Sequence, residues 1–147
     1  MEFQVNNVKY RADKMPALEA YDVARRLSPV LMQLGMMKRE ALNPPKGVAE
    51  GVVRTPPGPE AFARAFVALS VGLTREDSDI GVKACLNRVL RLQADIEKWA
   101  PIQVSGRMMF EDIGMDEMLQ IVWQVLDGNG LPDFFSAPRS DTETPKA

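Results

Sequence analysis

The sequence contains no histidine, and this absence excludes more chemistry than any other feature of its composition. Without histidine the chain lacks the commonest general base, the usual partner of a nucleophilic serine or cysteine, and the commonest zinc ligand. A single cysteine, Cys85, excludes an intrachain disulfide and fits a reducing cytoplasm. Neither glycine-rich phosphate-binding signature is present. We therefore expect no enzyme activity, no cofactor and no metal site.

Two further absences restrict the partners of the chain. The 18 lysine and arginine residues are balanced by 20 aspartate and glutamate residues, so the basic excess of a typical nucleic-acid-binding protein is missing. No apolar run approaches the length that spans a membrane, and no basic start followed by an apolar run marks a secretory signal. We expect neither nucleic acid nor a membrane to be a partner.

The sequence does contain a succession of amphipathic segments, beginning with a predicted β-hairpin. Apolar residues alternate with polar ones on both sides of Asn6-Asn7, a pair that suits a two-residue turn with positive φ. The buried face of this hairpin should consist of Phe3, Val5, Val8 and Tyr10. Helical periodicity follows over residues 15–37, with Asp13 as its expected cap and Ser28-Pro29 as the start of a second helix after a break.

The middle of the chain combines a proline-rich stretch with two predicted helices. Residues 41–59 hold five of the eleven prolines and three of the ten glycines, which favours a flexible connector over the alternative of a binding loop. A helix is expected over residues 60–71, with a stripe formed by Phe62, Ala65, Phe66 and Leu69. Thr74 should cap a longer helix that reaches about Ile96 and buries an unreactive Cys85.

The segment between that helix and the last one is expected to be extended. Trp99-Ala100-Pro101 should break the helix, and Ile102 and Val104 alternate with polar residues before a Ser105-Gly106 turn. The segment is either a second short hairpin or a strand that pairs with the N-terminal hairpin.

The densest apolar material lies between Gly106 and Phe135. A helix over residues 115–126 should bury the stripe Met115, Met118, Leu119, Val122, Val125 and Leu126 and end at Asn129-Gly130 and Pro132. The acidic cluster around its start, Glu111, Asp112, Asp116 and Glu117, is interpreted as a response to the helix dipole, with a hard metal ion as the alternative. A further alternative is a carboxylate pair, Glu111 with Asp116, in an enzyme.

Several apolar residues near this helix are candidates for binding a partner. The candidates are Met108, Met109, Phe110, Trp123, Phe134 and Phe135. Trp123 is expected to be an exposed aromatic, and Phe134-Phe135 either close the core or form part of a docking patch. The nine methionines suit either an irregular core or an adaptable binding surface.

Two blocks of the sequence resemble a known family. MEFQVNNVKYRADK with the following VARRLSPVL is similar to the start of the tail assembly chaperones of tailed bacteriophages. Trp99-Ala100-Pro101, GRMMFEDIGMDEMLQIVWQVL and Phe134-Phe135 resemble the C-terminal half of the same family in the same order. Residues 41–59 depart from the family pattern and look like an insertion.

The resemblance implies a non-enzymatic helper in the cytoplasm of the infected bacterium. Such chaperones hold the largely helical tape-measure protein soluble until the tail tube polymerises around it, and they are absent from the mature virion. The tail-tube protein is a further candidate partner. The alternative is a structural virion protein, such as a tail completion or head–tail joining subunit.

Taken together, the patterns predict an α+β fold. We expect one mostly helical domain over residues 1–135, with about four or five helices, an N-terminal β-hairpin and one more short strand or hairpin. Residues 136–147 should form a disordered polar tail.

Overall fold

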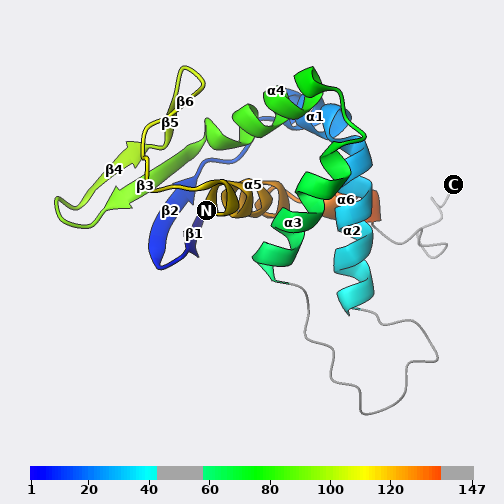
Figure 1. Cartoon of the computed structure of the whole chain (residues 1–147), viewed down its shortest axis with the longest axis horizontal. Coiled ribbons are helices and arrows are strands. Elements are labelled where there is room, and N and C mark those ends of the chain that lie inside the picture. Colours follow the sequence, from blue (N-terminus) through cyan, green and yellow to red (C-terminus); the bar gives the residue numbers. More distant parts are fainter. Residues whose placement is uncertain (43–57, 137–147) are drawn as a thin grey trace, which may run out of the picture.

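The computed structural model describes residues 1–42 and 58–136 (Figure 1). The elements in chain order are β1 (Glu2–Val5), β2 (Val8–Ala12), α1 (Ala17–Arg26), α2 (Ser28–Leu42), α3 (Pro59–Ser70), α4 (Arg75–Leu86), β3 (Val89–Gln93), β4 (Lys98–Pro101), β5 (Gln103–Val104), β6 (Arg107–Met108), α5 (Met115–Gly128) and α6 (Leu131–Ser136). Strands β1 to β4 form one antiparallel sheet in sequence order, and β5 pairs with β6. The predicted α+β class is confirmed.

The N-terminal hairpin forms as predicted. Asn6 and Asn7 both have positive φ, at 50° and 65°, as a type I′ turn requires. On its inner face Val5 and Tyr10 are buried, while Phe3 and Val8 are half-buried. An isolated hairpin is only marginally stable in water, and here β2 gains a second partner in β3.

The break between the first two helices is also confirmed. α1 ends at Arg26 and α2 begins at Ser28, directly before Pro29. The prediction that Asp13 caps α1 was wrong, because that helix begins at Ala17 after Pro16 and has no side-chain cap. The backbone N–H of Asp13 instead donates to the Arg88 carbonyl and extends the pairing of β2 with β3.

The helix predicted over residues 75–96 was too long. Its start is right, since the Thr74 hydroxyl accepts a hydrogen bond from the Asp77 N–H at 3.0 Å. The helix ends at Leu86, however, and the expected helical residues that follow form β3. Trp99-Ala100-Pro101, which was expected to break the helix, lies in β4. The free edge of β2 offers β3 a backbone partner, and such tertiary pairing overrides local helical periodicity.

Of the two structures proposed for the next segment, the second short hairpin is confirmed. Ser105 and Gly106 form its turn with φ values of 52° and 76°. The alternative, pairing of this segment with the N-terminal hairpin, is wrong because β3 occupies that place in the sheet.

Helix α5 lies at the centre of the molecule, between the sheet and the other helices (Figure 1). Four residues of its predicted stripe are buried: Leu119, Val122, Val125 and Leu126. Met118 is half-buried, but Met115 is 68% exposed, so its assignment to the buried stripe was wrong. Met115 is the first residue of α5, and the chain leading to it leaves its side chain uncovered.

The acidic residues near α5 divide into two groups. Asp116 and Glu117 lie in the first turn, where the helix dipole favours them, and Glu117 accepts a hydrogen bond from the Gly114 N–H at 2.9 Å. Asp112 precedes the helix and forms an ion pair with Arg91 of β3. The dipole interpretation therefore holds for the first group and not for Asp112.

A short helix, α6, follows α5 and was not predicted. Gly130, with φ of 72°, lies in the turn that follows α5. Pro132, which was expected to help stop α5, lies in the first turn of α6, where its missing N–H costs no hydrogen bond. Lys38 of α2 pairs with Asp127 of α5 at 2.6 Å and with Asp133 of α6 at 3.0 Å. This contact fixes α6 against α2.

Two predicted segments lie wholly or partly outside the described residues. The expected loop at 41–59 falls there except for its ends, which belong to α2 and α3. The expected tail at 136–147 falls there beyond Ser136. Within the described ranges, no helix has both the length and the apolar character needed to cross a membrane.

Candidate functional site

A groove lies between α3 and α4, with the N-terminal half of α5 as its floor. Figure 1 shows these two helices diverging from the turn that joins them, with α5 between them. The groove encloses about 260 Å³. We call it the helix groove, and its lining residues are Phe66, Val67 and Ser70 from α3, Ser78, Asp79 and Val82 from α4, and Met115, Met118 and Leu119 from α5.

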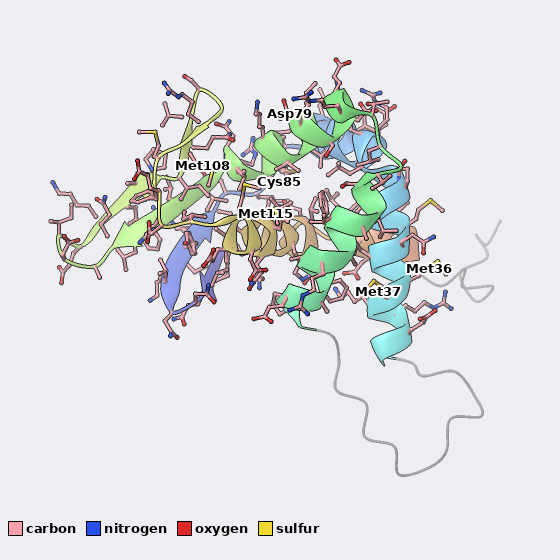
Figure 2. The ribbon with its side chains drawn as sticks, in the orientation of Figure 1. Met36, Met37, Asp79, Cys85, Met108 and Met115 are labelled. Carbon is pink, nitrogen blue, oxygen red and sulfur yellow. The ribbon has the colours of Figure 1, made fainter. Side chains whose placement is uncertain are left out.

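The helix groove is apolar at its base and accessible at its rim. Leu119 and Phe66 are buried beneath it, whereas Val67 is 43% and Met115 68% exposed. Figure 2 shows Met115 at the start of α5 and Asp79 on α4, and both residues line the groove. An exposed methionine above a buried apolar floor is suited to contact an apolar partner side chain, because the thioether chain is unbranched and adapts its shape.

The methionines divide between the surface and the core, so both interpretations that composition left open stay predictions. Of the nine, only Met15 is fully buried, and five are exposed: Met1, Met32, Met36, Met109 and Met115. Figure 2 shows Met36 and Met37 on α2, far from Met108 beside the sheet. Five methionines are thus exposed, while Met37, Met108 and Met118 pack against the core.

The predicted candidates at residues 108–110 differ in exposure. Met109 is 55% exposed, while Met108 and Phe110 are half-buried and pack against the core. The Arg91 guanidinium lies 4.5 Å from the centre of the Phe110 ring. Met109 is thus the most exposed member of this run.

Trp123 is not an exposed aromatic, and that prediction was wrong. It is 6% exposed and stacks on Phe62 of α3, with ring centres 3.9 Å apart and an interplanar angle of 7°. The close packing of α3 on α5 places the Trp123 ring inside the core. Trp123 therefore helps to position α3, which forms one wall of the helix groove.

Phe134 and Phe135 differ in exposure, so only Phe135 helps to close the core, and a docking role for Phe134 stays a prediction. Phe135 is half-buried and packs against the core, whereas Phe134 is 75% exposed. Both lie on α6 beside α2, at the other end of the molecule from β6 (Figure 1). The structure therefore does not bring the predicted candidates together into one surface.

A second hollow opens between the tips of the two hairpins β1–β2 and β3–β4, which point apart in Figure 1. It encloses about 510 Å³, and we call it the hairpin cleft. Its lining residues are Gln4, Asn7, Val8, Lys9, Arg91, Leu92, Gln93, Ala94, Asp95 and Phe110.

One wall of the hairpin cleft is held by a charged contact. Both terminal nitrogens of Arg91 donate to the carboxylate of Asp112, each at 2.8 Å. These hydrogen bonds, together with the positive charge of Arg91, hold the pKa of Asp112 below its ordinary value of 3.8. The two-pronged pair fixes the Arg91 guanidinium in place beside Phe110.

Three kinds of chemical site can be checked among the described residues: a metal centre, a carboxylate pair and a reactive thiol. The described residues contain no group of three or more aspartate, glutamate or cysteine side chains placed to hold a metal ion. Glu111 and Asp116 are both exposed, so they do not form the enclosed carboxylate pair considered above. Cys85 is fully buried, and burial raises the pKa of its thiol to about 12, as expected for an unreactive thiol.

Comparison with known families identifies the chain. Residues 6–141 match the family model described as "Phage tail assembly chaperone protein, TAC". The chain belongs to this family. No curated protein and no solved structure showed a match.

In this tail assembly chaperone, the helix groove was missed by sequence reasoning. Its walls come from α3 and α4, and its floor comes from α5, which lies far along the chain. One local signal was present: Val67 is an apolar residue outside the predicted stripe of α3. A second was the methionine at the first position of α5, where burial was assumed from periodicity alone.

Proposed function

We propose that the chaperone binds the tape-measure protein of its phage and keeps it soluble until the tail tube assembles around it. In this proposal it acts in the host cytoplasm, without catalysis, and does not remain in the mature virion. The observation that carries the proposal is the helix groove, an open apolar surface on a member of this family. Met109 and Phe134, exposed at other places on the surface, stay candidates for additional contacts.

The shape of the groove suits a helical client. Two diverging helices with an apolar floor can receive the apolar stripe of a third helix, a common mode of peptide recognition. Met115 and Met118 can adjust to apolar stripes of different composition. A holding chaperone needs this property when successive turns of its client carry different side chains.

The proposal is tested by co-expressing the tape-measure protein with the wild-type chain, a Met115→Glu variant and a Leu18→Glu control. Leu18 is 84% exposed on α1 and lies outside both hollows. Wild type and the control should raise the soluble fraction of the tape-measure protein and co-purify with it. Met115→Glu should weaken capture about tenfold or more, because it replaces an apolar contact of about 1.5–3 kcal/mol with a charge.

Three results would count against the proposal. If the tape-measure protein is equally soluble without this chain, and no complex is recovered, the function is wrong. If Met115→Glu binds as well as Leu18→Glu, the function stands and the groove is not the site. Abundant peptides of this chain in purified virions would favour the structural alternative, a tail completion or head–tail joining subunit.

A further inference from the structure

The two walls of the helix groove are anchored to the molecule in different ways. On α3, Phe62 and Phe66 are buried, and Phe62 stacks on Trp123 of α5. On α4, which lies beside α1 (Figure 1), no residue before Gly81 is buried. Asp79 lines the groove from this uncovered stretch. The first half of α4, residues 75–80, therefore lacks the apolar anchoring that fixes α3.

One ion pair connects this first half of α4 to another helix. Arg26 of α1 donates from Nη1 to Asp77 Oδ1 at 2.9 Å. In the described part of the chain it is the one side-chain hydrogen bond from residues 75–80 to a different helix, because the pair of Asp79 with Lys83 lies within α4. Leu73, in the turn before α4, adds a half-buried apolar contact with the core.

Both partners of this ion pair are held in place by further hydrogen bonds. The Arg26 Nε donates to Asp22 Oδ2 at 3.0 Å, one turn earlier on α1. The backbone N–H of Asp77 donates to the Thr74 hydroxyl at 3.0 Å. An isolated surface ion pair stabilises little, partly because two long side chains must be ordered to form it. That entropy cost is smaller here, because the network already orders Arg26, whose side chain is only 19% exposed.

We propose that Arg26 is a positioning residue for the helix groove. Through Asp77 it holds the first half of α4 beside α1, and so keeps this wall of the groove in the geometry that receives the client. A segment with few buried apolar contacts has low local stability, so residues 75–80 should open more readily without the ion pair. A wall that is already in place costs no ordering free energy when the client binds. The inference rests on the proposed function, but Arg26 does not itself line the groove.

Amide hydrogen exchange in the isolated chain tests the positioning directly. Arg26→Met keeps much of the aliphatic side chain and removes both hydrogen bonds. Exchange of the backbone amides in residues 78–80 should become about two- to fivefold faster, because opening of this stretch no longer breaks an ion pair. The amides of Cys85 and Leu86, in the buried half of α4, should exchange at the wild-type rate.

Arg25→Met is the matched control, because Arg25 is adjacent on α1 and its one ion pair in the described ranges is with Asp22, at 2.8 Å. Arg26→Met should capture the tape-measure protein more weakly than this control. The loss should be at most the factor found in exchange, since apparent affinity scales with the fraction of chains whose wall is in place. Asp77→Asn should act in the same direction, and its effect should not add to that of Arg26→Met in the double variant, because both remove one contact.

The possible failures are distinguishable. Unchanged exchange in residues 78–80 of Arg26→Met overturns the inference, and so does faster exchange that extends to Cys85 and Leu86, which would make Arg26 a stabiliser of the whole fold. Capture by Arg26→Met equal to that by Arg25→Met, or effects of Arg26→Met and Asp77→Asn that add, overturns it as well. All these results leave the proposed function intact. If the wild-type chain captures no tape-measure protein, the proposed function fails and the positioning role fails with it.

Discussion

At the scale of single residues, Gln120 is the one described side chain with a fully buried nitrogen that lacks a hydrogen-bond partner. It lies on the central helix α5 and is 6% exposed. A buried amide donor without a partner costs about 1–3 kcal/mol. Its position therefore lowers the stability of an otherwise apolar helix interface.

Replacing Gln120 by methionine should stabilise the protein. The variant removes the unpaired donor while keeping a similar shape and helix propensity, so the free energy of unfolding should rise by about 1 kcal/mol and the melting temperature by about 2–4 °C. Chemical and thermal denaturation measure both quantities. Gln124→Met, at a half-buried position of the same helix, is the control and should change stability by less than about 0.5 kcal/mol. A melting temperature below that of wild type would show that the amide of Gln120 has a partner.

At the scale of the elements, the sequence predicted best those features that depend on residues close to one another along the chain. The N-terminal hairpin, the break at Ser28, the Thr74 cap and most of the α5 stripe depend on local signals, and all four are confirmed. β3 depends instead on pairing with β2, which is distant in sequence, and its residues also fit a helical pattern. Only the free edge of β2 selects the strand.

The crossing of α1 and α4 gives a prediction about element packing. Gly81 allows the two helices to approach closely: a Cβ there would lie 2.7 Å from Leu27 Cδ2 and 2.8 Å from Leu27 Cγ. Leu27 is completely buried and has little room to move. The overpacking cost of about 1–3 kcal/mol should exceed the gain of about 1 kcal/mol in helix propensity.

Gly81→Ala should therefore lower the free energy of unfolding by about 1 kcal/mol, measured by denaturant titration. Gly72→Ala is a suitable control, because a Cβ there would make only an ordinary contact, 3.5 Å from the Leu69 carbonyl oxygen. If Gly81→Ala is as stable as this control, the close approach of α1 and α4 at Leu27 is wrong.

At the scale of the whole molecule, both hollows combine segments that are far apart in the sequence. The hairpin cleft joins the first strands to Phe110, and the helix groove joins α3 and α4 to α5. In the region 106–135 the sequence predicted most of the buried stripe of α5, but not the burial of Trp123 or the exposure of Met115. Trp123 is covered because α3 packs on it, and Met115 is uncovered because nothing in the described chain packs over it.

Ion pairs between separate segments also make the stability of the molecule depend on pH. Asp112 pairs with Arg91 of β3, and hydrogen bonds from Arg91 lower the pKa of Asp112. A carboxyl whose pKa is lower in the folded than in the unfolded chain stabilises the fold fully above the unfolded-state pKa. That stabilisation is lost as the pH falls through the folded-state pKa. The relevant window is thus below the ordinary value of 3.8.

Asp112→Asn should be less stable than wild type at neutral pH, by no more than about 1 kcal/mol because Asp112 is largely exposed. The difference should shrink towards zero as the pH falls through this window, because the wild-type carboxyl then becomes neutral as well. Denaturant unfolding of both proteins from pH 7 to pH 2, about the range in which carboxyl groups titrate, measures the difference directly. Asp95→Asn is the matched control, since Asp95 is exposed and forms no ion pair within the described ranges. If the difference in unfolding free energy stays constant down to the lowest pH, Asp112 stabilises the fold by packing and not by its charge. The Arg91–Asp112 ion pair would then not be what holds that wall of the hairpin cleft.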